Sequence, residues 1–477
     1  MSQGLAGAWV SKPTTLMPAI RAKILLGLLA FAVLVTAITI QRPKALNDFD
    51  QSFYVMIAYD LDRHSVFSNG VFDKVDSTRQ APPSGMFFVP GYPLLVYAAM
   101  KLDARFAKAV ECSVVAVNED KDTRLCDAYA TPVRVIHAAL LALAVVAIAL
   151  CGSLIFGSAR VFWIAGALAT ASLVAEADIL SFVMTESLTV SLYSVTMLLA
   201  VLAWKTGDTK WWGFTGLSLG LLCLTRPSFV VLIPALLLLI AIGGRFLKAK
   251  PSAWKSAAVF ITAVALTIGP WILRNHFSVG KWGLTEEYGA AVLIERLAYN
   301  DMSPMEFVTA FPYCTPGLGD MLFDQVYGRD SMHRFVYHTR DSFFHVGRGR
   351  RDALVQEHGR LDPLIGEIVR DEMRTSWWRH LLVSIPLAWC GMWVGWIVGL
   401  VLVPLFACAG VRAIRQGEPM LLLYTAPAIL MLGLHGVVAN HYTRYNLILI
   451  GPLAVGAAWM ISEWLQHARS RRQVPPN

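Results

Sequence analysis

The feature that most constrains this chain is the recurrence of apolar runs that contain no Asp, Glu, Lys or Arg and are long enough to cross a bilayer. A helix of about 20 apolar residues spans the hydrocarbon core of a membrane. Apolar residues make up 56% of the 477 residues and charged residues only 16%, whereas soluble domains contain about 45–50% and about 25%. We therefore expect an all-α polytopic membrane protein and exclude a series of soluble domains.

Ten runs fit the length of membrane spans. They are residues 24–40, 135–157, 161–176, 185–204, 211–225, 227–244, 256–273, 391–411, 419–440 and 445–463. With the N-terminus in the cytoplasm, most basic residues of the short loops lie inside, as the positive-inside rule requires. The formal charge of +8 is thereby explained without nucleic acid. The polar motif Gln41-Arg42-Pro43-Lys44 after the first run predicts an uncleaved span, because a signal peptide ends in small residues.

Two connections, 41–134 and 274–380, are too long to be simple loops, and both lie outside under this topology. The expected division is a catalytic membrane module over 1–273, which includes the first outer loop, a second outer loop or subdomain over 274–380, and C-terminal helices with a cytoplasmic tail over 381–477. The apolar stretch from Pro82 to Met100 could also span. However, its four prolines interrupt helical hydrogen bonding, and a span there would reverse every later loop. It is expected to be a re-entrant or interfacial segment on the outer face.

The cysteines fit this orientation. Cys112 and Cys126 flank a polar segment of the first outer loop. In an oxidising compartment they are expected to form a bridge that stabilises the loop by about 3 kcal/mol. Four others lie in apolar runs and are expected to fill the core; these are Cys151, Cys223, Cys390 and Cys408. Cys314 is then left unpaired.

Acidic residues gather at the outer ends of the spans. Asp50 begins an amphipathic segment that is expected to form a helix lying on the membrane surface. Asp48 or Asp50 could simply cap that helix, which Asp does well. Glu186, at the outer start of the fourth span, could likewise be an acid in a first helical turn, favoured by the helix dipole. Glu176 and Asp178 in the same connection are expected to be solvated loop charges.

Three arginines, Arg226, Arg274 and Arg444, lie at the outer ends of spans. A single arginine there most simply extends to lipid headgroups. Three on a face with little other positive charge favour a common anionic ligand, and a guanidinium binds phosphate through two parallel hydrogen bonds.

A second feature of the outer face is the motif Pro90-Gly91-Tyr92-Pro93, which is either a plain turn or a shaped segment beside a membrane groove. Arg79 suits either environment. His435 is expected to be a hydrogen-bonded core histidine. No His/Cys/Asp cluster has the spacing of a zinc site. A divalent metal between Asp50 and Glu186 is an open alternative that no motif supports.

These residues lie in motifs that resemble the polytopic glycosyltransferases of the GT-C fold, specifically the family-39 clan. That clan includes dolichyl-phosphate-mannose protein mannosyltransferases and bacterial lipid A aminoarabinose transferases. The matching motifs are Asp50 with Tyr54 and Ala58, PPSGMFFVPGYPLL (82–95), MTESL (184–188), LTRPS (224–228), PWILRN (270–275) and RYNLILIGP (444–452). Together they cover most of the chain in topology. The chain departs from the pattern at Gln51, where many relatives have Glu or Ser, and in the insertion-like Cys112–Cys126 segment. The second outer loop matches no motif and is expected to help define the acceptor.

The resemblance implies an inverting glycosyltransferase that uses a polyprenyl-phosphate sugar as donor. It assigns the role of catalytic base to Asp50, with Asp48 as a competitor, and Glu186 could orient the acceptor or the first-loop helix. Arg226, Arg274 and Arg444 would bind the leaving phosphate. Further candidates for substrate contacts are Tyr54, Arg79, Tyr92 and Tyr445.

A transporter or lipid flippase is the main alternative. Transporters place functional charges near the bilayer midplane, whereas here the spans are nearly free of charge and the acids gather at one face. The enzyme is therefore favoured. The chain has no Asn-x-Ser/Thr sequon and no ER retention tail, which favours a bacterial inner membrane with a periplasmic active face. The implied partners are undecaprenyl phosphate as carrier and an envelope glycolipid, surface glycan or protein as acceptor.

Overall fold

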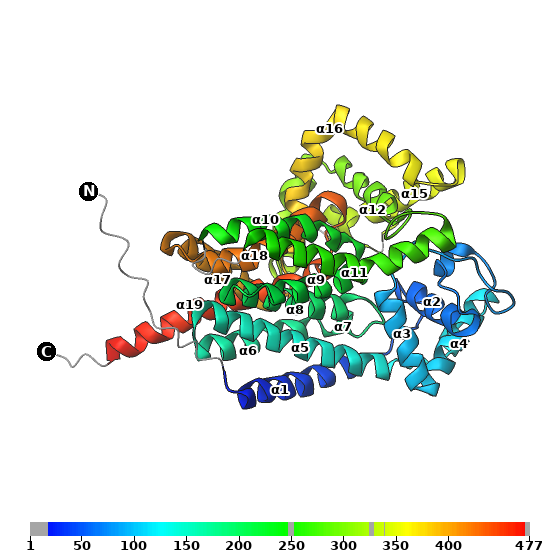
Figure 1. Ribbon diagram of the computed structural model, residues 1–477. Helices are drawn as coiled ribbons and strands as arrows, with labels where there is room; N and C mark the ends of the chain where they lie inside the picture. Colours follow the sequence, from blue (N-terminus) through cyan, green and yellow to red (C-terminus); the bar gives the residue numbers. More distant parts are fainter. Residues whose placement is uncertain (1–17, 247–251, 324–328, 338, 473–477) are drawn as a thin grey trace.

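A computed structural model describes residues 18–246, 252–323, 329–337 and 339–472. This part of the chain is helical and contains no β-strand. Most long helices run side by side in one bundle (Figure 1). They are α1 (Ile20–Thr39), α5 (Thr131–Phe156), α6 (Ala159–Ala175), α8 (Glu186–Thr206), α9 (Thr209–Cys223), α10 (Leu232–Phe246), α11 (Ala253–Val279), α17 (Ile397–Gln416), α18 (Pro419–Val438) and α19 (Ile450–Arg472). The start of α1 and the end of α19 lie at one end of the bundle, opposite α2–α4 (Figure 1).

Seven helical stretches of the described chain are long and apolar enough to cross a membrane. They are α1, α5, α8, α11, α17, α18 and the stretch Thr443–Ser470. Each of the ten predicted spans coincides with helix, but Ala159–Ala175 and Pro227–Gly243 are shorter apolar helices, and α9 has 15 residues. The chain is thus an all-α integral membrane protein, as predicted, while the count of ten spans stays a prediction.

Close helix packing holds the bundle together. α5 packs against α1, α6 and α8, and α9 lies between α8 and α11. The contact of α9 with α11 depends on glycine, because a Cβ atom at Gly216 would collide with the backbone carbonyl of Phe260, and one at Gly220 would collide with Thr267. Small residues of this kind let membrane helices approach closely.

The first outer loop folds into three helices, α2 (Gln51–His64), α3 (Gly91–Leu102) and α4 (Ala104–Asn118), at one end of the bundle (Figure 1). They share a core that includes Val55, Tyr92, Val96 and Phe106. The expected helix after Asp50 is therefore present, but its apolar face packs on protein and not on the membrane surface. The stretch 82–100 includes α3, and residues of α3 pack in this core; its expected place on the outer face stays a prediction.

The second outer region begins after α11, which continues to Val279. It contains α12 (Tyr288–Leu297), α13 (Pro304–Cys314), α14 (Leu318–Leu322) and α15 (Phe343–His358), and it leads into α16 (Asp362–Gly391). Tyr299, Phe335 and Phe343 form part of its own core. α16 bends at Ser376 and continues across residue 380, where the sequence placed a boundary.

Two disulfides tie the outer regions. The predicted pair Cys112–Cys126 is present, with Cα atoms 5.7 Å apart. The expectation that Cys314 is unpaired and Cys390 is core filler was wrong, because these two form a second bridge that joins α13 to the end of α16. Their separation of 76 residues hides the pairing in the sequence. Cys151 and Cys223 are buried as expected, but Cys408 is exposed.

Candidate active site

Asp50 lies directly before α2 and faces the far end of the chain. Its Oδ2 atom accepts a hydrogen bond from Nη2 of Arg444 at 2.9 Å, although the two residues are 394 positions apart. The alternative that Asp50 merely caps α2 fails, because its side chain makes no capping hydrogen bond. The Asp50 side chain is 44% exposed and that of Arg444 is 20% exposed, so a ligand can reach this pair.

Glu186 forms the second acid–arginine pair, and it is far more deeply buried. Its side chain is 2% exposed, and its Oε1 atom accepts a hydrogen bond from Nη2 of Arg226 at 2.8 Å. Arg226 also donates through Nε to the hydroxyl of Thr185 at 2.9 Å. The Glu186 Oε2 atom is buried and has no hydrogen-bond partner among the described residues. Because an unsatisfied buried oxygen is costly, this atom is a candidate to receive a ligand hydrogen bond.

Tyr445 joins the two pairs. The guanidinium of Arg226 lies 5.3 Å from its ring centre and that of Arg444 lies 4.9 Å from it. Arg444 also donates to the Tyr445 hydroxyl at 3.1 Å. Both arginines are thereby held beside one aromatic ring, where cation–π attraction helps to fix them. The site therefore contains two carboxylates and two guanidiniums supported by one tyrosine, at the bundle end that carries α2.

Two further tyrosines line this cluster. Burial raises the pKa of Tyr54 well above its usual value, and the charge of Asp50 raises it further. Burial likewise raises the pKa of the Tyr288 phenol, and the neighbouring Tyr445 phenol raises it further. Both phenols therefore stay protonated and can donate hydrogen bonds. The sequence did not identify Tyr288 as a site residue, because Tyr288 lies in the second outer loop, which carries no recognisable motif.

Other predicted residues lie apart from the acid–arginine cluster. Arg274 donates to the backbone carbonyls of Gly85 and Phe67, the latter at 2.9 Å. Its guanidinium also lies 4.9 Å from the Trp271 ring, so it clamps the first outer loop to α11. A role for Arg274 in phosphate binding stays a prediction.

Tyr92 and Arg79 likewise have partners of their own. Tyr92 is fully buried, and its hydroxyl is 3.0 Å from Nε2 of His137. Arg79 is mostly exposed and pairs with Asp76 at 3.2 Å. Neither placement tests the predicted contact with substrate.

The neighbours of the site residues explain how the loops are held. Asp48 contributes its backbone carbonyl, which accepts from the side-chain Nε2 of Gln51 at 3.2 Å. The Gln51 side chain also accepts from the backbone of Val183 at 2.7 Å and thereby ties α2 to the segment before Glu186. Glu176 is not a solvated charge, as was expected, because it accepts from the Gly395 amide at 2.7 Å. His435 donates through Nδ1 to Oδ1 of Asn446 at 2.8 Å in the core, as predicted.

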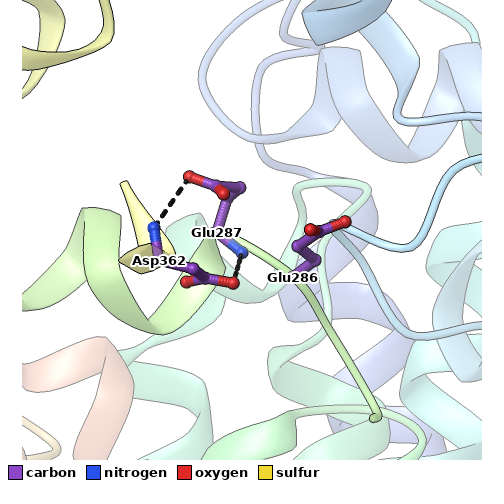
Figure 2. A group of neighbouring side chains, drawn as sticks. All are labelled: Glu286, Glu287 and Asp362. Atoms are coloured by element: carbon purple, nitrogen blue, oxygen red, sulfur yellow. Dashed lines mark hydrogen bonds between the residues drawn. The ribbon is translucent and has the colours of Figure 1, made fainter. Parts of the chain in front are cut away.

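Three carboxylates outside this cluster could hold a metal ion, because one oxygen atom of each lies within 4.8 Å of the others. They belong to Glu286, Glu287 and Asp362 (Figure 2). Their contacts explain them without one. The Glu287 amide donates to the Asp362 carboxylate at 2.9 Å, and the Asp362 amide donates back to Glu287. Glu286 pairs with Arg360 and with Lys281. The trio thus joins the start of α12 to the start of α16.

Comparison with known proteins agrees with this architecture. The family described as dolichyl-phosphate-mannose-protein mannosyltransferase matches residues 123–271, which is less than half of the chain. Among solved structures, the archaeal oligosaccharyltransferase AglB from Archaeoglobus fulgidus, in complex with an inhibitory peptide and a dolichol-phosphate, has a TM-score of 0.51 at 14% identity. That match covers 96% of this chain and 52% of AglB, so the chain spans about half the length of that protein.

ArnT from Cupriavidus metallidurans is also similar, at a lower TM-score of 0.38. Its apo structure shares 13% identity, covering 92% of this chain and 77% of ArnT, and its complex with undecaprenyl phosphate shares 14%, covering 92% and 78%. No curated protein sequence matches the chain significantly. The chain has the GT-C fold, and the resemblance inferred from its motifs is confirmed at this level.

Proposed function

We propose that the chain is an inverting glycosyltransferase that moves a sugar from a polyprenyl-phosphate donor to an acceptor hydroxyl at the outer face of the membrane. The observation that carries the proposal is the site itself. Asp50 and Glu186 come from distant segments, each with its own arginine, and both arginines meet on Tyr445. A carboxylate that can accept a proton and two guanidiniums that can bind a phosphate lie side by side. This arrangement suits a reaction in which an acceptor hydroxyl displaces a phosphate from a sugar.

In this mechanism Asp50 accepts the proton of the acceptor hydroxyl while that oxygen attacks the anomeric carbon of the donor. The half-exposed carboxylate of Asp50 is open to an incoming group, whereas Glu186 is enclosed. The hydrogen bond from Arg444 uses one of the two Asp50 oxygens, so it can hold the carboxylate in position while the other oxygen receives the proton. General-base help of this kind contributes about 10²–10⁴-fold to a rate.

The arginines act on the other half of the reaction. As the bond between the sugar and the phosphate breaks, the electron pair goes to the phosphate oxygen and negative charge develops there. Arg226 and Arg444 can stabilise that charge because they are already fixed in a partly buried site and need no reorganisation. Glu186 keeps Arg226 in place, and its free Oε2 atom can accept a hydrogen bond from a sugar hydroxyl.

Two observations support the lipid carrier and the compartment. AglB, with the same fold, binds a dolichol-phosphate, which is a lipid phosphate of the proposed chemical class. The pair Cys112–Cys126 lies in a region expected outside, and Cys390 pairs with Cys314, which also lies in such a region; disulfides persist in oxidising compartments such as the bacterial periplasm. We therefore propose undecaprenyl phosphate as carrier and a periplasmic active face.

Mass spectrometry of envelope glycolipids and of polyprenyl-phosphate sugars tests the proposal. Three strains are compared: a deletion strain, the same strain with the wild-type gene restored, and one restored with Asp50→Asn. The proposal expects a glycan mass that is lost on deletion and regained only with the wild-type gene. Recovery with Asp50→Asn would exclude Asp50 as the base. Identical profiles in all three strains would count against a glycolipid acceptor and reopen the transporter alternative.

A further inference from the structure

Aromatic side chains from separate parts of the chain meet beside Asp50. Phe49 packs edge-on against Phe182 with ring centres 5.5 Å apart and lies 6.1 Å from Tyr337 in the second outer region. The Tyr337 ring is 4.8 Å from Phe344 and 6.3 Å from Tyr442. We call Phe49, Tyr337, Phe344 and Tyr442 the aromatic wall. It connects the residue before the proposed base to the part of the chain that the family motifs do not explain.

The aromatic wall is not an ordinary core. Phe49 is 52% exposed, and Tyr337, Phe344 and Tyr442 are half-buried. Phe49 also has a φ of 53°, in the left-handed region that bulky side chains rarely adopt. Such backbone strain is retained at functional sites when the surrounding structure enforces it. The strained backbone and the exposed ring of Phe49, next to Asp50, therefore indicate a surface that contacts a ligand.

Polar groups lie next to the wall. Phe344 lines a small cavity of about 30 Å³ together with Glu295, Asn440 and Tyr445, which is room for roughly one water-sized group. Glu295 is fixed by a hydrogen bond from Arg351 at 2.6 Å. The Tyr442 hydroxyl is buried and has no hydrogen-bond partner among the residues that the structure describes. The cavity thus offers a carboxylate and an amide, with an unsatisfied hydroxyl on the wall beside it.

We propose that the aromatic wall forms the acceptor subsite, that a sugar ring packs on it, and that the cavity beside it receives one hydroxyl group of that sugar. The inference rests on the proposed function and narrows its acceptor. A sugar ring presents an apolar face of C–H groups, which packs on aromatic rings, and edge hydroxyls, which need planar acceptors and donors such as Glu295 and Asn440.

A titration of acceptor with purified full-length protein tests this. The donor is the polyprenyl-phosphate sugar extracted from the deletion strain. The acceptor is, in one arm, the glycolipid extract of that strain and, in the other arm, its envelope protein fraction. The variants are Phe344→Leu, which keeps an apolar side chain but removes the ring, and Glu295→Gln. Val346→Ala, an exposed position on the same helix, is the matched control. Binding of undecaprenyl phosphate and thermal unfolding are measured for each protein.

The inference expects sugar transfer to the glycolipid arm. It expects Phe344→Leu to raise the half-saturating acceptor concentration about 2- to 10-fold, the range that one aromatic contact supplies. Glu295→Gln raises it too, while undecaprenyl phosphate binding stays at the wild-type level and Val346→Ala behaves as wild type. Transfer to the protein fraction, or normal saturation by both folded variants, overturns the subsite but leaves the proposed function standing. Absence of transfer by the wild-type protein in both arms overturns the proposed function and the subsite with it.

Discussion

Replacement of Arg226 by Met tests how much the buried ion pair between Arg226 and Glu186 contributes to the free energy of unfolding. The Glu186 carboxylate is 2% exposed, one oxygen has no hydrogen-bond partner among the described residues, and the other depends on Arg226. Without the guanidinium, a negative charge stays buried with no compensating partner. Breaking a buried ion pair in this way costs about 3–5 kcal/mol. Arg226→Met should therefore lower the free energy of unfolding by that amount at pH 7.

A double-mutant cycle separates this effect from a general disturbance. Unfolding in urea, followed by tryptophan fluorescence in detergent micelles, is compared for Arg226→Met, Glu186→Gln and the double variant. The double variant should recover much of the loss, because a neutral amide does not need the guanidinium. Arg124→Met is the matched control: Arg124 also pairs with an acid, but it is 86% exposed, and such pairs contribute less than about 1 kcal/mol. The reasoning is refuted if Arg226→Met is as mild as Arg124→Met, or if the double variant is no more stable than Arg226→Met.

Three further predictions follow from the outer regions. Burial raises the pKa of Asp60 to about 6, above its usual 3.8. Because the unfolded state loses this proton at lower pH, the free energy of unfolding should fall by up to about 3 kcal/mol as pH rises from about 4 to about 6. Asp60→Asn should remove this decrease, and a pH dependence identical to that of wild type would contradict the assignment. Arg274→Ala should increase hydrogen exchange in residues 67–88, because Arg274 holds this loop, and should leave the affinity for undecaprenyl phosphate near that of wild type. Unchanged exchange with weakened binding would show that Arg274 contacts the lipid phosphate and does not hold the loop. Alkylation of the denatured, unreduced protein should modify three cysteines and, after reduction, all seven; mass spectrometry that finds more than three before reduction would exclude one of the two bridges.

The positions of the membrane helices could be predicted because one physical quantity decides them. A bilayer of fixed thickness requires uncharged apolar runs of matching length, so α1, α5 and α8 are visible in the sequence. The length rule does not describe α2 and α3, whose apolar faces pack on protein. Apolar periodicity reports that a face is buried, but it does not report whether lipid or protein covers it.

The candidate site could be predicted only in part. The sequence predicts Asp50, Glu186, Arg226 and Arg444 on one face, because each lies at the end of a span that the predicted topology places outside. It does not say which acid meets which arginine, because the pairing of Asp50 with Arg444 depends on the path of the whole chain. Arg274 has the same local setting as the other two arginines, yet it binds backbone carbonyls.

The second outer region was the least predictable part. The cysteines of its disulfide, Cys314 and Cys390, lie 76 residues apart, and Cys390 is embedded in an apolar run that resembles a core. Tyr288 and Glu295 carry no motif, and their positions beside the site arise from the packing of α12 against α15. Long-range contacts of this kind leave no periodic signal in a single sequence.

The release of free polyprenyl phosphate by the purified protein tests the central claim most directly. The substrate is the extracted polyprenyl-phosphate sugar with glycolipid acceptor, and the products are measured by mass spectrometry for wild type and for Asp50→Asn. The account predicts that wild type releases free polyprenyl phosphate in step with sugar transfer, and that Asp50→Asn is slower by about 10²–10⁴-fold while it still binds undecaprenyl phosphate. Absence of release by the wild-type protein, or equal rates for the two proteins, would contradict it.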